Sequence, residues 1–196
     1  MRRPRMPDSA LSAELAERGA LLDGHFKLSS GRHSNRFIQK FRILEDPRLV
    51  EPLAREIAAA VREFAPTVVV SAAVGGIVLG YEVGRALGTL AIFVEKENGV
   101  PTLRRGFALG PADRVLVVED VVTTGLSVRE VFDVVRAKGA EVVAVAVIVR
   151  RQPSDFGVPT IALLDLPVES YAPEECPQCA RGEALVEPGS RHIASK

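Results

Sequence analysis

The chain has 196 residues, of which 47% are hydrophobic and 26% charged, values typical of a globular protein rather than a disordered or fibrous one. Its 25 basic and 25 acidic residues cancel, which argues against a general affinity for nucleic acid or for a membrane surface. The longest apolar run, residues 142–149, is too short to cross a bilayer, and no signal-peptide pattern follows the start. Two cysteines are too few for a disulfide framework, which favours a cytoplasmic protein. The length predicts a single domain over residues 1–196.

The N-terminal part of the chain predicts a helix, a hairpin and a second helix. Apolar residues recur at helical spacing over residues 9–22, and alternating apolar and polar residues before a Ser-Ser-Gly turn predict a hairpin over residues 24–37. Asp46 and Pro47 start another helix, which ends near Pro66. The small and basic residues of the hairpin make it a candidate rim for a ligand.

From residue 67 onward, short runs rich in valine alternate with helical segments. The helical patterns cover residues 77–87 and 127–138, and the apolar runs cover residues 67–71, 90–94, 115–118, 142–149 and 160–164. Continuous apolar runs that alternate with helices are typical of a parallel sheet covered on both faces. The sequence therefore predicts an α/β fold with a central, mostly parallel five-stranded sheet flanked by helices.

Two adjacent acidic residues and a hydroxyl-rich loop follow the run at 115–118. This segment consists of Glu119, Asp120, Val121, Val122, Thr123, Thr124, Gly125, Leu126 and Ser127. In α/β folds, ligands bind beyond the carboxyl ends of the strands. Hydroxyl groups and the N–H groups of a helix N-terminus suit a phosphate, and carboxylates accept hydrogen bonds from sugar hydroxyls. The segment predicts a ribose 5-phosphate site; a solvated strand end before a capped helix is the alternative.

A pair of glycines follows the earlier run at 67–71. The junction comprises Ala73, Val74, Gly75 and Gly76 and leads into a predicted helix. Glycine allows a backbone to approach a pyrophosphate closely. A plain tight turn is the alternative for this pair taken alone.

Residues 115–127 resemble the phosphoribosyl pyrophosphate (PRPP) signature of the type I phosphoribosyltransferases, with both acids and the Thr-Thr-Gly in place. The match departs at Leu126, where that family commonly has threonine, so one hydroxyl group toward the phosphate is missing. The resemblance implies that the segment from Glu119 to Ser127 binds PRPP, with Glu119 and Asp120 in catalytic positions at the ribose. It also implies that the turn from Ala73 to Gly76 binds the pyrophosphate.

Further segments resemble one branch of this family, the orotate phosphoribosyltransferases. Residues 26–34 are similar to the N-terminal hood, and residues 149–152 fall where the branch carries Asp-Arg-Gln. Residues 176–179 and 188–191 look like the ending of one bacterial group. The resemblance implies a hood from about residues 9–45 and 165–196 over a core of about residues 46–164.

Two residues for the base follow from the same resemblance. Arg151 matches an arginine that pairs with the carboxylate of orotate, and Thr123 matches a threonine that contacts the pyrimidine ring. A planar guanidinium is a natural bidentate partner for a carboxylate. A surface arginine without a partner is the alternative for Arg151 on its own.

Residues 93–106 predict a flap of two extended arms around an Asn-Gly turn. Many family members carry a flexible loop here, with Arg-Lys, a second lysine and a histidine, which enters the neighbouring subunit's site. Lys96 matches the first lysine, which implies a catalytic contact with the pyrophosphate, but Glu95 replaces the arginine, and the second lysine and the histidine have no counterparts. We hypothesise that Arg104 and Arg105 supply the missing charge; an ordinary charged hairpin is the alternative.

The resemblance implies transfer of the 5-phosphoribosyl group from PRPP to orotate, giving orotidine 5′-phosphate and pyrophosphate in de novo pyrimidine biosynthesis. Mg²⁺ is the implied cofactor, held mainly by PRPP with few protein ligands, and a homodimer is the implied assembly. A phosphoribosyltransferase for purines or uracil remains open, although it gives no reason for Arg151. An RNA-binding regulator of the same fold also remains open, although zero net charge argues against it.

The two cysteines, Cys176 and Cys179, form one Cys-x-x-Cys pair. One pair is half of a structural zinc site, and His25, His33 and His192 show no metal-ligand spacing along the sequence. We therefore expect a tail turn with free thiols, with a metal site or a disulfide as the alternative.

Overall fold

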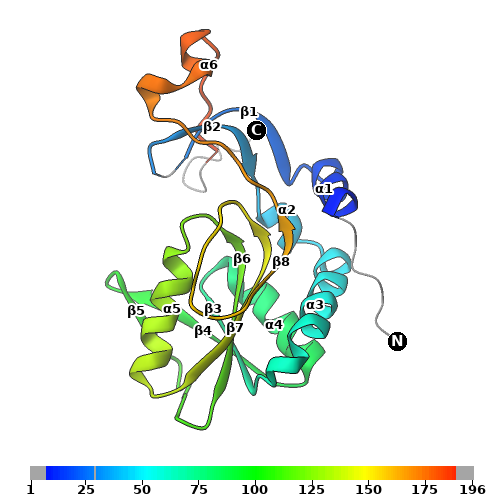
Figure 1. Cartoon of the computed structure of the whole chain (residues 1–196), viewed down its shortest axis with the longest axis vertical. Helices are drawn as coiled ribbons and strands as arrows, with labels where there is room; N and C mark the ends of the chain where they lie inside the picture. The colour runs from blue at the N-terminus through cyan, green and yellow to red at the C-terminus, as the bar shows by residue number, and fades with distance from the viewer. Residues whose placement is uncertain (1–7, 29, 189–196) are drawn as a thin grey trace.

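Helices and strands alternate along most of the chain in the computed structural model, which describes residues 8–28 and 30–188 (Figure 1). The N-terminal elements are α1 (Asp8–Glu17), β1 (Leu21–Lys27), β2 (His33–Ile38), α2 (Phe41–Leu44), α3 (Pro47–Val61) and the 3-10 turn η1 (Arg62–Phe64). The central elements are β3 (Val68–Ala72), α4 (Gly75–Leu87), β4 (Leu90–Glu97), β5 (Val100–Leu103), β6 (Arg114–Val122) and α5 (Leu126–Ala137). The last elements are β7 (Glu141–Arg150), β8 (Thr160–Asp165), the 3-10 turn η2 (Pro173–Glu175) and α6 (Pro177–Ala180). The predicted ending at 188–191 lies outside the described residues from Gly189 onward.

The central sheet has six strands in the order β5-β4-β3-β6-β7-β8, one more than the five predicted. Every neighbouring pair is parallel except β4 and β5, which pair antiparallel. The additional strand is the second arm of the flap. Asn98 and Gly99 adopt positive φ values of 53° and 84°, and this turn folds residues 100–103 back onto β4.

Alternate residues of the sheet face two separate apolar layers, as expected for strands buried on both sides. One layer joins Val69, Leu116 and Ala146 to the apolar sides of α1, α3 and α4. The other joins Val70, Val117 and other sheet valines to α5. Helices thus cover both faces of the sheet (Figure 1), and the carboxyl ends of its parallel strands stay open at one edge.

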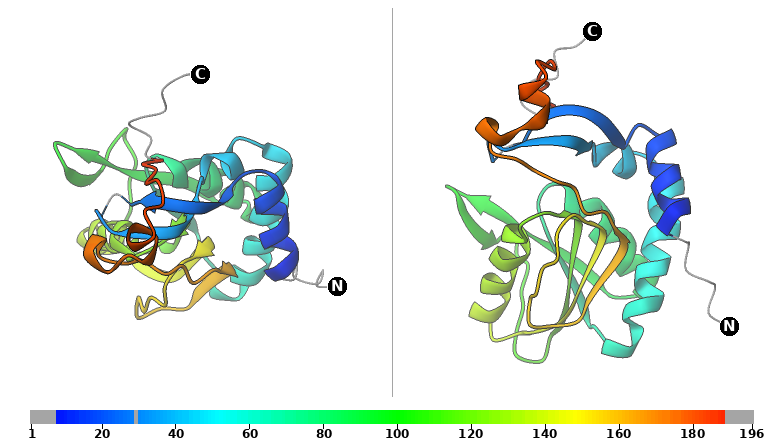
Figure 2. Two further views of the ribbon diagram at one scale, coloured as in Figure 1. Left: turned by 90° about the horizontal axis from the view of Figure 1, so that it is seen from above. Right: turned by 45° about the horizontal axis from the view of Figure 1, so that its top comes forward.

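A hairpin of β1 and β2 and the C-terminal tail lie together over that edge, as both views of Figure 2 show. The backbone pairs His33 with Tyr171 and Phe26 with Val186. The hood is narrower than the predicted 9–45 and 165–196. Leu11, Leu15 and Ile43 pack in the main apolar layer, because their helices present apolar sides to it, and so do Leu166 and Val168.

None of the helices that the structure describes is long and apolar enough to cross a membrane.

Candidate active site

The acid pair and the glycine pair meet at the carboxyl edge of the sheet, although more than 40 residues separate them in sequence. A Cβ atom on Gly75 would lie 1.9 Å from Asp120 Oδ2, and one on Gly76 would lie 3.2 Å from Glu119 Oε1. Only glycine fits so near to Asp120. The two junctions that the sequence analysis singled out therefore form one site, because β3 and β6 are adjacent parallel strands.

Glu119 and Asp120 are buried at the end of β6, with 7% and 1% of their surface exposed. The Asp120 N–H donates to Glu119 Oε1 over 3.0 Å, and the Val121 N–H donates to Asp120 Oδ1 over 2.6 Å. Burial, followed by the negative charge of Asp120, raises the pKa of Glu119 to about 8. At neutral pH the ligand-free site therefore favours one proton on this pair.

Lys40, which the sequence analysis did not identify, supplies the positive charge beside this pair of acids. Its Nζ lies 3.0 Å from Asp120 Oδ2 and would be 2.8 Å from a Cβ on Gly75. Lys40 lies between β2 and α2, and its local sequence pattern carries no signal for a site. Only the folding of the hairpin over the sheet edge brings it to Asp120.

The loop after β6 forms the N-terminal end of α5. Gly125 is the N-cap, with φ of 78°, and it has no side chain to bond the N–H groups of the first turn. Thr123, Thr124 and Ser127 are exposed around them, and a cavity of about 50 Å³ is lined by Glu119 and residues 121–128. Such a helix end, free of a side-chain cap, is suited to an anion.

Val121 and Val122, like the acid pair before them, belong to β6 rather than to the loop. The Val122 side chain is buried in the apolar layer of α5, and its carbonyl accepts from the Arg151 N–H over 2.8 Å. A phosphate-binding loop therefore begins only at Thr123. On the glycine side, Ala73 and Val74 are exposed at the edge while Gly75 and Gly76 are buried.

Arg151 lies immediately after β7, beside this loop. It is 8% exposed, it forms no salt bridge with any residue that the structure describes, and its Nε has no hydrogen-bond partner. Burial lowers the pKa of its guanidinium. The neighbouring Arg150 is instead neutralised by Asp165, with N–O distances of 2.6 and 2.9 Å.

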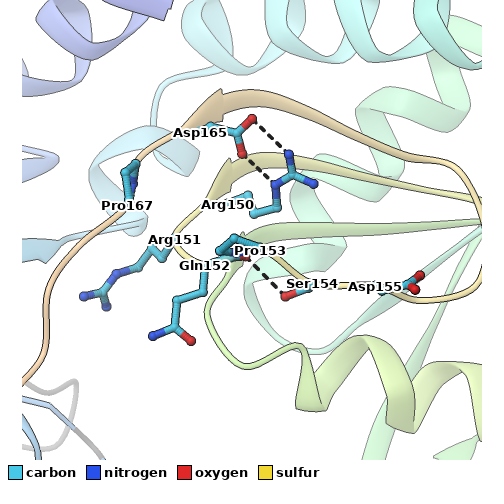
Figure 3. Close-up of a pocket in the computed structure, with 8 residues that line it drawn as sticks. All are labelled: Arg150, Arg151, Gln152, Pro153, Ser154, Asp155, Asp165 and Pro167. Atoms are coloured by element: carbon cyan, nitrogen blue, oxygen red, sulfur yellow. Dashed lines mark hydrogen bonds and ion pairs between the residues drawn. The ribbon is translucent and has the colours of Figure 1, made fainter.

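A cavity of about 560 Å³ is lined by residues 150–155 together with Asp165 and Pro167. Its size is within the range of small-molecule sites. Figure 3 shows the side chains of Arg151 and Gln152 extending to the side away from the ion pair of Arg150 and Asp165. Arg151 therefore presents an uncompensated positive charge to this cavity, which is where an anionic ligand is stabilised.

The predicted flap residues lie further from the acid pair. Lys96 on β4 pairs with Glu130 of α5 over 2.8 Å, one turn beyond the loop at 123–127. Arg105 pairs with Glu95 over 3.0 Å, and Arg104 pairs with Glu97 over 3.2 Å. Both arginines are thus held by acids of their own hairpin, which favours the charged-hairpin alternative.

Comparison with known proteins gives consistent matches. Residues 42–158 match the family described as the phosphoribosyl transferase domain. The orotate phosphoribosyltransferase of Pelotomaculum thermopropionicum is 54% identical over 177 residues, covering 89% of this chain and 93% of that protein. That of Chlorobaculum parvum is 48% identical over 191 residues, covering 96% and 99%. The crystal structure of the Mycobacterium tuberculosis orotate phosphoribosyltransferase superposes with a TM-score of 0.68 at 29% identity, covering 82% of this chain and 97% of that one.

Proposed function

Because this chain belongs to the phosphoribosyl transferase family, and within it to the orotate phosphoribosyltransferases, we propose how its own residues divide the work of that reaction. The reaction transfers the 5-phosphoribosyl group of PRPP to orotate and releases pyrophosphate. The observation that carries the proposal is Arg151, a buried guanidinium that pairs with no acidic residue in the part of the chain that the structure describes. Its backbone N–H donates to the Val122 carbonyl, just before the hydroxyl loop.

The sugar phosphate occupies the junction of β6 and α5. Glu119 and Asp120 accept hydrogen bonds from the ribose hydroxyls, and the backbone and hydroxyl groups from Thr123 to Ser127 hold the 5′-phosphate. The free N–H groups of the first turn of α5 and the absence of a capping side chain at Gly125 support this placement.

The pyrophosphate lies against the turn from Ala73 to Gly76, with Lys96 reaching it when the flap closes. Gly75 and Gly76 let the backbone of this turn lie close to Asp120 and Glu119, and Lys40 adds positive charge next to Asp120. Leaving-group stabilisation of this kind requires charge that is already in place before the bond breaks.

Mg²⁺ fits this edge of the sheet, because the buried carboxylates of Glu119 and Asp120 offer the oxygen ligands that it prefers. When bound together with PRPP, the ion neutralises charge on the pyrophosphate. Glu119 and Asp120 would orient it, either directly or through water.

Orotate binds in the cavity beside Arg151. The guanidinium pairs with the carboxylate of the base, and Thr123 contacts the pyrimidine ring from the neighbouring strand end. Loss of pyrophosphate from the anomeric carbon develops positive charge on the ribose, as in glycoside cleavage. The two binding sites therefore act mainly by holding the ring nitrogen of orotate in line with that carbon.

The first test compares orotate with adenine, hypoxanthine, xanthine and uracil, each with purified protein, PRPP and Mg²⁺. We expect only orotate to be consumed. Replacement Arg151→Ala removes a charge-assisted contact and should raise the KM for orotate by roughly 10- to 100-fold, with little change in the KM for PRPP.

Arg55→Ala is the control, because Arg55 is an exposed arginine of α3 that pairs with Glu51 and does not line the cavity. It should change both KM values by less than about twofold. Turnover of another base in place of orotate, or equal effects of the two arginine variants, would contradict the proposed base site. Asp120→Asn tests the ribose site apart from the base site, since it should lower kcat for orotate.

A further inference from the structure

Four metal-binding side chains meet in the hood, away from the proposed substrate sites. His25 lies on β1, His33 lies on β2, Cys176 is the N-cap of α6, and Cys179 lies within α6. Their ligand atoms all lie within 4.8 Å of one another. Neither cysteine forms a disulfide. The sequence analysis expected free thiols in a tail turn, with a metal site or a disulfide as the alternative, because spacing along the sequence does not reveal that the two histidines join the two cysteines.

Four of the six separations between these atoms are close to the edges of a tetrahedron around one ion. His25 Nε2 lies 3.2 Å from His33 Nδ1, 3.4 Å from Cys176 Sγ and 3.6 Å from Cys179 Sγ. His33 Nδ1 lies 3.2 Å from Cys179 Sγ. Zinc bonds of about 2.0 Å to nitrogen and about 2.3 Å to sulfur give tetrahedral edges of roughly 3.3–3.8 Å.

The surroundings of the cluster also suit a metal ion. His25 Nδ1 lies 3.0 Å from the carbonyl oxygen of Glu183. A carbonyl only accepts, so Nδ1 carries the proton, and Nε2 presents its lone pair to the centre of the cluster.

The hood needs such a connection, because it lacks an apolar core of its own. Among the described residues, neither apolar layer contains a residue from 22–37 or 169–188. Backbone bridges at His33 and Phe26, the surface ion pair of Lys27 with Glu187 and side-chain hydrogen bonds otherwise join the tail to the hairpin. Units of this size are usually stabilised by metal ions or disulfides.

We propose that His25, His33, Cys176 and Cys179 bind one Zn²⁺ ion that fixes the C-terminal tail to the hairpin of the hood. Four protein ligands leave no open position on the ion, so the site is structural and takes no part in phosphoribosyl transfer. Two thiolates with two imidazoles are a ligand set that zinc prefers over Mg²⁺, which takes oxygen ligands. The site is therefore distinct from that of the magnesium ion.

The test measures the metal content of the full-length protein by inductively coupled plasma mass spectrometry after gel filtration. We expect about one zinc per chain in the wild type and less than about one tenth of that in Cys176→Ser and in His25→Gln. Arg36→Ala is the matched control, because Arg36 lies on the same hairpin and pairs only with the exposed Asp23. It should retain the full zinc content.

A second measurement covers the case in which these variants fail to fold. Wild-type protein is stripped with a chelator and reloaded with Co²⁺, which should give the visible bands of a tetrahedral ion together with thiolate-to-cobalt charge transfer. Trypsin cleavage after the exposed Arg181 should be at least about tenfold faster in the stripped protein than in the reloaded protein. Wild-type protein without zinc, a cobalt spectrum without thiolate bands, or cleavage at equal rates would overturn the proposal.

Discussion

Glu119 and Asp120 are neighbours in sequence, yet the fold gives them different partners. Asp120 pairs with Lys40 close to Gly75, whereas Glu119 lies beside Gly76, where burial and Asp120 raise its pKa more than Lys40 lowers it. Alternating directions along a strand explain this difference. Burial, followed by the charge of Asp120, raises the pKa of Glu119 to about 8, so its proton is part of the ligand-free site.

This proton predicts a pH dependence of stability in the ligand-free protein. The glutamate carboxyl ionises near 4.5 when unfolded and near 8 when folded, so the folded state holds the extra proton between these values. The free energy of unfolding should therefore fall as the pH rises from about 4.5 to 8. Glu119→Gln should flatten this part of the curve and raise the Tm at pH 8, as measured by calorimetry. Glu17→Gln, on an exposed part of α1, is the control; equal slopes in both variants would contradict the assignment.

The close approach of Gly75 to Asp120 predicts that a larger side chain at position 75 weakens PRPP binding. In Gly75→Ala the new Cβ would lie 1.9 Å from Asp120 Oδ2, so Asp120 has to move and PRPP binding should weaken by at least about tenfold. Gly110→Ala is the matched control, since a Cβ there meets nothing within 4 Å. Isothermal titration with Mg²⁺ and PRPP measures both; equal affinity in the two variants would remove Gly75 from the site.

The flap, formed by the ends of β4 and β5, is joined to the rest of the molecule by few charged contacts. Lys96 pairs with Glu130 of α5, while Arg104 and Arg105 pair with Glu95 and Glu97 of the flap itself. Of these three cations, Lys96 is the one whose partner lies on α5, shortly after the loop at 123–127. The two arginines mainly neutralise Glu95 and Glu97, and Glu95 is the residue that the resemblance aligns with an arginine.

Steady-state kinetics can separate these roles. We expect Lys96→Ala to lower kcat/KM for PRPP by at least about tenfold, because its charge acts on the leaving pyrophosphate. The double variant with Arg104→Ala and Arg105→Ala should keep kcat within about twofold, as expected for exposed ion pairs. A tenfold loss in the double variant would instead support the hypothesis that these arginines supply the missing charge of the flap.

At the scale of the whole molecule, exposed apolar side chains gather on one flank of the sheet. Val78 and Tyr81 of α4 are 43% and 64% exposed, and Leu90 at the start of β4 is 74% exposed. Val78 and Tyr81 are three residues apart and therefore share a face of the helix. The family resemblance implies a homodimer, and we propose that this surface contacts the second copy of the chain. The single domain over residues 1–196 likewise stays a prediction.

Light scattering coupled to gel filtration tests the assembly. We expect a mass of twice 21.1 kDa for the wild type. Tyr81→Glu should shift the mass toward that of one chain, because a buried unpaired charge destabilises an apolar interface. Glu82→Gln, at the adjacent position of α4, is the control. A wild-type mass of 21.1 kDa would contradict the proposed homodimer.

The sequence by itself determined which polar features follow the apolar runs of the parallel strands. These are, in chain order, the glycine pair, the acid pair with its hydroxyl loop, and Arg151. It did so because parallel strands bring their carboxyl ends to one edge, whatever the loops between them do. The sixth strand was missed because a short arm of a hairpin joins the sheet only through pairing with β4.

Only the tertiary structure decided which distant residues join these. Lys40 reaches Asp120 across 80 positions of the chain, and Cys176 reaches His25 across 151. Neither contact is marked by a local sequence pattern, because each depends on how the hairpin and the tail pack over the sheet edge. Local sequence patterns therefore predict most residues of the substrate site, whereas the hood that covers it depends on contacts between segments that are distant in sequence.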